Sequence, residues 1–256
     1  MKLLEGKKAA IFGVANDRSI AWAIAEAFHA EGAELAFTYA GEILEKRVRP
    51  LAEGVGSKII LPCDVTRDED IEKVFSTLNQ EWGGLDILIH AIAFANREDL
   101  SNPYVQTSRA GFHLALDVSA YSMVALARHA APLMEGRNGS MVAMTYMGSE
   151  KVIPNYNVMG IAKAALEASV RYLAYDLGPK GIRVNAISAG PIRTLAASGI
   201  SDFKTMLHHV ADKAPLKRNI DAEEVGKTAL YLCSEWGSAV TGEVMHVDAG
   251  YNIMGM

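Results

Sequence analysis

The strongest constraint on the fold is an alternation of short apolar runs, rich in branched residues, with longer segments of helical period. This alternation is typical of repeated strand–helix units, whose strands form one parallel sheet. The chain has 256 residues and half of them are apolar, which suits a single hydrophobic core. We predict one α/β domain over residues 1–256, a doubly wound, Rossmann-like sheet of seven parallel strands with helices on both faces. The expected strands are 9–13, 34–39, 58–61, 85–91, 140–144, 183–188 and 243–247.

Two segments between these strands carry clear helix signals. Thr66 and Glu69 have the spacing of a capping box, and Asp221 is placed to cap a second helix. Behind each cap, apolar residues recur at helical spacing and define one buried face. These residues are Ile71, Val74, Phe75 and Leu78 in the first helix, and Val225, Ala229 and Leu232 in the second.

Composition excludes several function classes. The formal net charge is -5 and both signs are interspersed, so the clustered Lys and Arg of a nucleic-acid binder are missing. The seven histidines include no His-Glu-x-x-His motif, and we expect no metal. Cys63 and Cys233 lie in apolar runs, where buried and reduced thiols are the expected state.

The sequence favours a cytoplasmic protein. The first apolar run ends at Asn16-Asp17-Arg18 without becoming the core of a signal peptide. The longest apolar stretch, residues 87–95, is interrupted by His90 and falls short of the ~20 residues that cross a bilayer. We therefore expect no membrane association and a reducing cytoplasm. A plastid stroma fits equally well if a transit peptide has been removed.

The turn after the first strand is a candidate nucleotide site. Gly13 ends that strand and a helix begins near Ile20, so free amides at the helix N-terminus can meet an anion such as a pyrophosphate. The usual Gly-x-Gly-x-x-Gly pattern is missing; only Gly13 remains, with small Ala15, Ser19 and Ala21 where close approach is needed. These residues alone leave two interpretations open, a dinucleotide site or a structural strand–helix turn.

The ends of the next strands add to the same site. Asp64 and Val65 are expected to end the third strand, where a carboxylate can accept a hydrogen bond from an adenine amino group. Ala91, Ile92 and Ala93 are expected to end the fourth strand, and small residues there admit a flat ring or a ribose. Each feature alone also fits a helix cap or a tight turn. Ligands bind beyond the carboxyl ends of strands in a doubly wound sheet, so their recurrence there favours the nucleotide site.

Residues from about 190 to 218 break the rhythm of strand–helix units. This segment carries a run of small residues at 196–199 and is expected to form a loop with short helices. We predict a mobile lid over the substrate, and a plain surface excursion is the alternative.

Two tyrosines and a lysine near the fifth strand are the candidate catalytic residues. Tyr146 follows that strand, and Tyr156 opens a long helix that carries Lys163. Seven residues make close to two helical turns, so Tyr156 and Lys163 are expected to share a face with a rise of ~10 Å. An isolated tyrosine and lysine at this spacing would more often simply flank a helix surface.

Three motifs favour a catalytic role for Tyr156 and Lys163. The first is Gly13 with Ser19-Ile20-Ala21, the second is Tyr156 with Lys163, and the third is the run 183–194. Together they resemble the enoyl-acyl-carrier-protein reductases, a divergent branch of the short-chain dehydrogenase/reductase superfamily. The Tyr-x6-Lys spacing discriminates, because ordinary members carry Tyr-x3-Lys and position 160 here is glycine. The resemblance extends to the terminal run 242–250 and so covers essentially the whole chain.

The resemblance implies roles for individual residues. In these reductases the residue matching Tyr156 bonds the thioester carbonyl, and the one matching Lys163 holds the nicotinamide ribose hydroxyls. Tyr146 matches a second active-site tyrosine, and Ala95 matches a position beside the substrate. The positions that would contact the dinucleotide are Gly13, Ser19, Ile20, Asp64, Val65, Ile92, Lys163, Ile192, Arg193, Thr194, Leu195 and Ala196.

The resemblance also implies cofactor and partners. Such reductases use NADH, act in fatty-acid synthesis on trans-2-enoyl thioesters held by a small acidic acyl carrier protein, and are usually homotetramers. The chemistry agrees, since conjugate addition of hydride pushes electrons onto the thioester oxygen, where a tyrosine hydroxyl can donate a hydrogen bond. A tyrosine pKa of about 10 keeps it protonated, and the Lys163 ammonium is expected to favour its ionised form.

Two other functions are compatible with a nucleotide-binding fold of this kind. A ketone reductase of the same superfamily is disfavoured by the Tyr-x6-Lys spacing. A non-enzymatic nucleotide-sensing module is disfavoured by the presence of both tyrosines together with the lysine, although fold alone does not decide function.

Two further expectations concern charge. After the second strand, Ala40 and Glu42 offer no cation to a 2′-phosphate, which favours NADH over NADPH. A group of basic residues around the predicted lid is expected to meet the acidic carrier, and a solvated helix face is the alternative. This group comprises Arg193, Lys204, Lys213, Lys217 and Arg218.

Overall fold

The computed structural model describes residues 2–194 and 203–255. Its strands form one sheet in the order β3-β2-β1-β4-β5-β6-β7, and every neighbouring pair is parallel. The predicted seven-stranded doubly wound sheet is confirmed, and each predicted strand end lies within two residues of the observed one. The strands are β1 (Lys8–Phe12), β2 (Glu34–Tyr39), β3 (Ile59–Pro62), β4 (Ile87–His90), β5 (Ser140–Thr145), β6 (Arg183–Ala189) and β7 (Val244–Val247).

The strand order reverses beside β1. β2 and β3 lie on one side of β1, while β4 to β7 lie on the other. Phe12 at the end of β1 is in register with His90 at the end of β4. Ligands of doubly wound sheets bind at this reversal, beyond the carboxyl ends of the strands.

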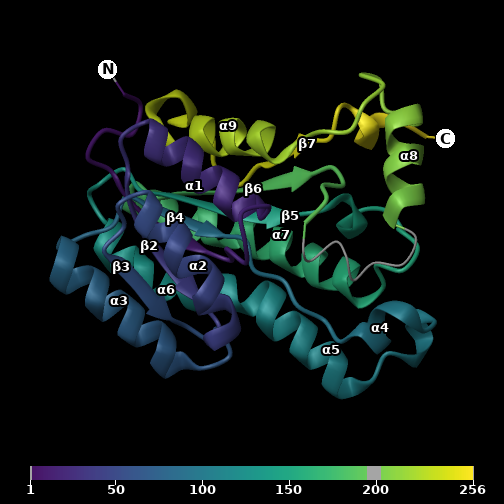
Figure 1. The fold of residues 1–256 in the computed structure, drawn as a ribbon, viewed down its shortest axis with the longest axis horizontal. Helices are drawn as coiled ribbons and strands as arrows, with labels where there is room; N and C mark the ends of the chain where they lie inside the picture. Colours follow the sequence, from purple (N-terminus) through teal and green to yellow (C-terminus); the bar gives the residue numbers. More distant parts are fainter. Residues whose placement is uncertain (1, 195–202, 256) are drawn as a thin grey trace.

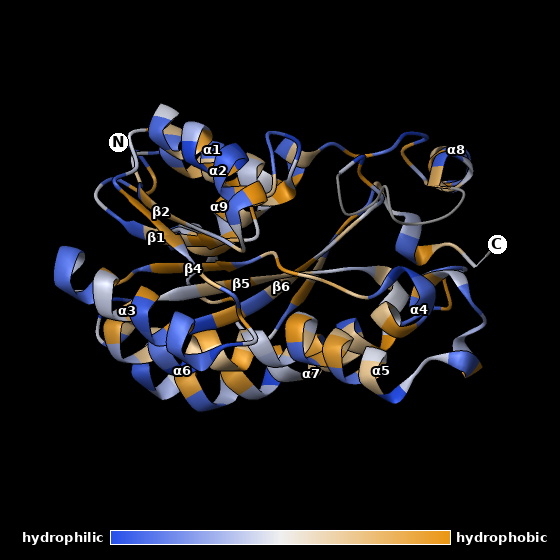
Figure 2. Cartoon of the chain, turned by 60° about the horizontal axis from the view of Figure 1, so that its bottom comes forward, coloured by the Kyte–Doolittle hydropathy of each residue, from blue (hydrophilic) through white to orange (hydrophobic). Residues whose placement is uncertain are grey.

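Helices cover both faces of the sheet (Figure 1). Each layer buries its own apolar cluster against the strands, and this burial is the main stabilising term of the fold. Figure 2 shows α1 (Ile20–Ala30), α2 (Glu42–Gly54) and α9 (Ala222–Cys233) on one face, and α3 (Asp68–Trp82), α6 (Ser122–Met134) and α7 (Val158–Leu177) on the other. A Cβ atom on Gly226 of α9 would lie 2.8 Å from the carbonyl oxygen of Ala23 in α1, so only glycine allows these helices to pack so closely.

Shorter elements complete the described chain. α4 (Arg97–Ser101) and α8 (Phe203–Lys213) lie at the end of the molecule toward which β5 and β6 run (Figure 1). α8 falls in the region predicted as a loop with short helices. The others are α5 (Arg109–Leu116), the π-helix η2 (Asp117–Tyr121) and the 3₁₀ turns η1 (Tyr104–Gln106), η3 (Met147–Ser149), η4 (Gly178–Lys180), η6 (Glu235–Gly237) and η7 (Tyr251–Ile253).

The two predicted helix caps have different outcomes. Asp221 caps α9 as predicted, because its carboxylate accepts from the Glu224 amide at 2.9 Å and Glu224 accepts from the Asp221 amide at 3.1 Å. The predicted capping box of Thr66 and Glu69 is wrong. The N-cap of α3 is Arg67, and the Thr66 hydroxyl donates to Asp64 at 2.8 Å. This local bond competes with capping.

One continuous helical run, Arg109–Met134, is long and apolar enough to cross a membrane by length and composition alone. It comprises α5, η2 and α6, and half of its most apolar window is buried inside the fold. α6 packs against α3 and α7 beneath the sheet. Packing within the molecule therefore accounts for the apolar character of this run.

Candidate active site

The turn from β1 to α1 approaches the exit of β4 at main-chain contact. Gly13 has a φ of 109°, a backbone conformation that residues with a side chain rarely adopt. A Cβ atom at this position would overlap the carbonyl oxygen of Ala91. Glycine is therefore required here by both conformation and space, which explains why it is the one glycine kept from the usual nucleotide-binding pattern.

The residues after Gly13 suit an anion. The Ser19 hydroxyl accepts hydrogen bonds from the amides of Ala15 at 2.9 Å and Asn16 at 3.0 Å, which fixes the shape of the turn. α1 begins at Ile20 without a side-chain cap and without an acidic residue in its first turn. The Ile20 and Ala21 amides at the start of α1 have no hydrogen-bond partner among the described residues, and they fit the pyrophosphate of a dinucleotide.

Asp64, Val65 and Ile92, the residues predicted around the adenine, lie just beyond the carboxyl ends of β3 and β4. β3 ends at Pro62, so Asp64 follows the strand by two residues and is exposed, while Val65 is buried in the core. The Asp64 Oδ1 atom accepts from the Thr66 amide at 3.0 Å and from its hydroxyl at 2.8 Å. Ile92 is half-buried just beyond β4.

The segment after β6 is described in part. Ile192 and Thr194 are half-buried and Arg193 is exposed, and the Thr194 amide donates to the Ile192 carbonyl at 2.9 Å. Ile192 packs against the same apolar cluster as Ile20 and Ala91, so the segment after β6 and the nucleotide turn border one core. The predicted contacts Leu195 and Ala196 lie outside the described residues.

The two tyrosines meet edge to face. The ring centroids of Tyr146 and Tyr156 are 5.0 Å apart with an interplanar angle of 74°. The Tyr146 hydroxyl lies 3.5 Å from the sulfur of Met206 in α8, so the segment after β6 contacts this pair. The Tyr156 ring lies directly against Gly148, where a Cβ atom would overlap it. The ring is thereby fixed in place.

The prediction that Tyr156 opens the helix is wrong. α7 begins at Val158, and Tyr156 lies in the turn before it, between two asparagines with positive φ. The argument from two helical turns therefore does not apply to Tyr156. What brings the tyrosine into the site is its turn and its contact with Gly148 after β5.

Lys163 is anchored to the end of β5. Its Nζ atom donates to the Met144 carbonyl at 2.8 Å, and the side chain is buried. Burial lowers the pKa of Lys163 to about 8, and the Glu167 carboxylate opposes this shift. Glu167, also buried, accepts from the Thr145 hydroxyl at 2.6 Å. Successive residues of β5 thus hold successive turns of α7.

Both tyrosine hydroxyls are firmly protonated. Burial raises the pKa of Tyr146 to about 12, helped by Tyr251, and burial also raises the pKa of Tyr156. For Tyr156 the neighbouring Tyr146 and Glu167 add to this rise. The expectation that Lys163 would favour the ionised form is therefore wrong, because burial and the neighbouring Tyr146 and Glu167 all raise the pKa of Tyr156. Tyr156 is suited to donate a hydrogen bond and to keep its proton.

Two buried polar residues near Lys163 were missed. His90 bonds Ser122 at 2.7 Å through Nε2, and Ser122 donates to the Val118 carbonyl at 2.7 Å. Burial, reinforced by Lys163, lowers the pKa of His90 to about 3, so it is neutral at neutral pH. Glu167 was missed as well. The available signals were a histidine inside an apolar strand and a carboxylate one turn after a lysine on an apolar helix.

The predicted basic group is smaller than expected. Arg218 forms a bidentate ion pair with the two carboxylate oxygens of Glu224, at 2.8 and 2.6 Å, and Glu224 belongs to the capping box of α9. Lys217 donates to the Asp212 carbonyl at 2.6 Å, and Lys213 is half-buried. Arg193, Lys204 and Lys217 are the exposed cations of the group without an ion pair among the described residues, and of these Lys217 is bound to a main-chain carbonyl.

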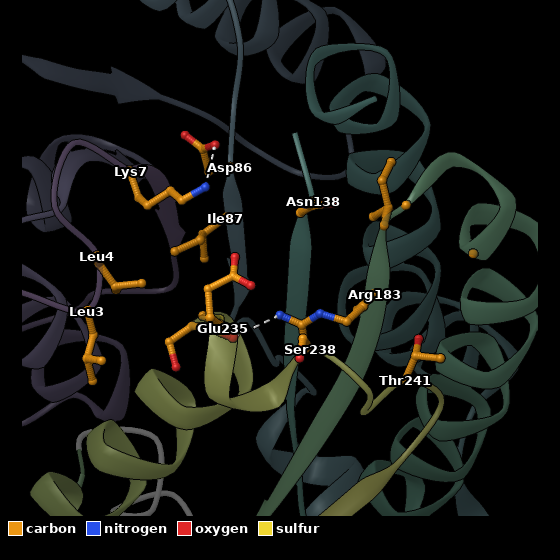
Figure 3. A pocket seen from close by; sticks show the side chains of 15 residues that line it. Leu3, Leu4, Lys7, Asp86, Ile87, Asn138, Arg183, Glu235, Ser238 and Thr241 are labelled. Carbon is orange, nitrogen blue, oxygen red and sulfur yellow. Dashed lines mark hydrogen bonds and ion pairs between the residues drawn. The ribbon is translucent and has the colours of Figure 1, made fainter. Parts of the chain in front are cut away.

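A separate cavity of about 330 Å³ lies at the amino ends of the strands, opposite the candidate site (Figure 3). Asp86 pairs there with Lys7 at 3.5 Å and with Arg137 at 3.1 Å, and Arg183 donates to the Leu232 carbonyl at 2.6 Å. The Asp86 carboxylate in the cavity wall is therefore compensated by two cations. Cys233 lines the cavity and, like Cys63, is a free buried thiol whose pKa is raised by burial to about 12, as expected for inert cysteines.

Comparisons with known proteins point to one family. Residues 13–252 match the family model described as enoyl-(acyl carrier protein) reductase. The enoyl-[acyl-carrier-protein] reductase [NADH] FabI of Aquifex aeolicus is 56% identical over 100% of this chain and 95% of the relative. The FabI of Bacillus cereus is 54% identical over the whole of both chains.

Solved structures show the same likeness. The Aquifex aeolicus enzyme superposes with a TM-score of 0.97 over 99% of both chains at 56% identity. The Bacillus cereus enzyme, solved with NADP+ and indole naphthyridinone, gives 0.97 over 100% of both chains at 54% identity. The Anaplasma phagocytophilum enzyme, solved with NAD, gives 0.95 over 99% of this chain and 97% of the other, at 53% identity.

Proposed function

Because the chain belongs to the enoyl-[acyl-carrier-protein] reductase family, we propose that it reduces the carbon–carbon double bond of trans-2-enoyl thioesters borne by an acyl carrier protein in fatty-acid elongation. NADH, when bound, supplies the hydride that the β-carbon receives. The observation that carries the proposal is the Tyr156 ring, fixed beside Tyr146 with its hydroxyl protonated, on the segment that leads into the helix of Lys163.

The residues divide the work. Tyr156 donates a hydrogen bond to the thioester oxygen, which becomes negative as the enolate develops. Lys163, held from behind by Met144, binds the ribose hydroxyls and orients the nicotinamide. Gly13, Ser19 and Ile20 receive the pyrophosphate. Asp64, Val65 and Ile92 serve the adenosine side, and Ala95 serves the acyl chain. Ile192, Arg193 and Thr194 contact the nicotinamide side, and the family resemblance implies dinucleotide contacts for Leu195 and Ala196, which lie outside the described residues.

We also propose that the chain is a single domain and that the region from about 190 to 218 is a lid over its substrate site. The contact of Tyr146 with Met206 supports it, because α8 already touches the catalytic pair. A lid excludes water from the reacting groups.

The activity is tested by following NADH absorbance with a crotonyl thioester. We expect NADH oxidation with the crotonyl thioester and none with an acetoacetyl thioester, and at least ~10-fold lower kcat/KM with NADPH. Beyond β2, Ala40 and Glu42 are exposed and offer no cation, and Arg49 is bound to Glu45 at 2.5 Å. Oxidation with the acetoacetyl thioester would instead make the chain a ketone reductase, and a higher kcat/KM with NADPH would refute the cofactor preference.

Carrier docking predicts an effect of charge reversal at Lys204. The acidic carrier should meet the exposed Arg193 and Lys204 near the mouth of the site. Lys204→Glu is expected to lower kcat/KM for a carrier-bound substrate at low salt by ~3- to 10-fold, and to leave a carrier-free crotonyl thioester unaffected. Lys58→Glu, an exposed lysine at the start of β3, is the matched control. If Lys204→Glu has no effect on the carrier-bound substrate, Lys204 has no part in docking.

We also propose a homotetramer in the cytoplasm, or in a plastid stroma for a plastid protein. The outer face of α7 exposes Ile161, Tyr172 and Tyr175, and such aromatic surface on a long helix suits contact with a second copy. The buried free thiols agree with a reducing compartment. Light scattering on the purified chain decides the assembly, and a mass of one chain would refute it.

A further inference from the structure

Tyr156 is held by an unusual stretch of backbone. The Tyr156 amide donates to the Ile153 carbonyl at 3.1 Å, with Pro154 second and Asn155, at φ 63°, third in the turn. This is the arrangement of a type II turn. Asn157 follows with φ 42° and ψ −121°, outside the regions that side-chain-bearing residues normally populate. Backbone of this kind persists only where surrounding contacts hold it.

The contacts that hold Asn157 come from its own side chain. Its Nδ2 atom donates to the carbonyls of Asp99 at 3.3 Å, Leu100 at 3.1 Å and Asn102 at 2.9 Å. These carbonyls end α4 and have no partner within that helix. The residue after Tyr156 is thereby tied to a segment more than fifty residues earlier in the chain.

That segment forms one side of the proposed substrate site. It runs from Phe94 at the exit of β4, through Ala95, to Asn102, and we call residues 94–102 the wall segment. Its start is also tied to α7, because Ser119 accepts from the Phe94 amide at 3.0 Å and lies 3.7 Å from the sulfur of Met159. The wall segment is thus linked at its end to Asn157 and at its start, through Ser119, to Met159 in the first turn of α7.

We propose that Asn157 is a positioning residue, whose side-chain amide sets the wall segment and the Tyr156 hydroxyl in one fixed relation so that acyl thioester and hydrogen-bond donor are placed together. The inference rests on the proposed enoyl reductase function. Asn157 touches neither the reacting atoms nor the cofactor in this account. Its effect should therefore appear in the thioester parameters and be absent from the binding of NADH.

Two substitutions distinguish the effect of the Asn157 backbone conformation from the effect of its side-chain hydrogen bonds. Asn157→Gly tolerates the positive φ but removes all three hydrogen bonds. Asn157→Asp retains the size and tolerance of positive φ but turns a carboxylate toward three carbonyl oxygens. Asn155→Gly is the matched control, because Asn155 also has positive φ and neighbours Tyr156, yet its side chain makes no hydrogen bond in the described part of the chain.

We expect kcat/KM for the crotonyl thioester to fall by ~10-fold in Asn157→Gly and further in Asn157→Asp, through both a higher KM and a lower kcat. The NADH dissociation constant should stay within twofold of wild type, and Asn155→Gly should behave as wild type. A purely structural role would lower Tm and the active fraction without changing KM. Wild-type thioester parameters in both Asn157 variants, or an equal loss in Asn155→Gly, would overturn the inference. An inactive wild-type chain would instead refute the proposed function itself.

Discussion

Tyr156→Phe is expected to lower kcat for an enoyl thioester by ~10²-fold or more, with little change in the NADH dissociation constant. The hydroxyl is buried, and its raised pKa keeps it protonated as a donor. The thioester oxygen gains negative charge only as the enolate forms, so the lost bond is strongest in the transition state. The phenylalanine ring should hold the same place, because the ring packs on Gly148. Single-turnover rates and NADH titrations measure the two quantities.

Tyr146→Phe provides the matched control for this variant. Its ring lies 5.0 Å from that of Tyr156, but its hydroxyl faces the sulfur of Met206, a weak acceptor. We expect a smaller loss of kcat than in Tyr156→Phe. If Tyr146→Phe loses more than Tyr156→Phe, the donor to the enolate is Tyr146 and the roles must be exchanged.

Lys163→Met is expected to weaken NADH binding by ~10- to 100-fold, since a hydrogen bond to a charged group is lost in the ground state. Methionine matches the volume of the buried lysine, so the packing between α7 and β5 should survive. The single-turnover rate at saturating NADH should fall less than in Tyr156→Phe. Equal losses of NADH affinity in Tyr156→Phe and Lys163→Met, with unaltered rates at saturation, would show that the division of labour is wrong.

The same lysine predicts the alkaline limb of the pH profile. Its pKa in the free enzyme is about 8, below the ordinary value, so the ammonium is present at lower pH and is lost as pH rises through about 8. The kcat/KM for NADH should fall above that pH. Tyr156 should add no limb there, because burial moves its pKa upward. Lys163→Met should show a lower and flat profile.

Glu167→Gln tests the cause of that pKa. The Glu167 carboxylate is the group that opposes desolvation of Lys163, so its neutralisation should move the alkaline limb to lower pH. The glutamine oxygen can still accept from Thr145, which preserves the link between α7 and β5. An alkaline limb at unchanged pH in Glu167→Gln would assign the limb to another group.

Most of the fold could be predicted because hydrophobic period reports burial directly. All seven strands follow from branched apolar runs, and Asp221 followed by Glu224 has the signature of its cap. Thr66 shows the limit of such patterns. Its hydroxyl had two possible partners, the helix amides and Asp64, and the sequence does not say which lies closer.

The sequence and its family resemblance supplied the candidate site residues, but not their geometry. Tyr146, Tyr156 and Lys163 do gather at the end of β5, whereas the helix starts two residues after Tyr156. The positive φ of Asn157 is held by hydrogen bonds to residues 99–102, far away in sequence, and no local pattern carries that information. The sign of the Tyr156 pKa shift was missed for the same reason, since desolvation depends on what the fold places around the hydroxyl.

The position of Tyr156 outside α7 bears on how this branch could diverge from relatives with shorter tyrosine-to-lysine spacing. Two side chains on one helix can change their separation only by whole turns if both are to stay on the same face. A tyrosine on a turn is not bound by this helical periodicity. Residues can therefore be gained or lost before Val158 while Lys163 keeps its hydrogen bond to the Met144 carbonyl. The place of the catalytic donor can thus change without altering the contact between Lys163 and the end of β5.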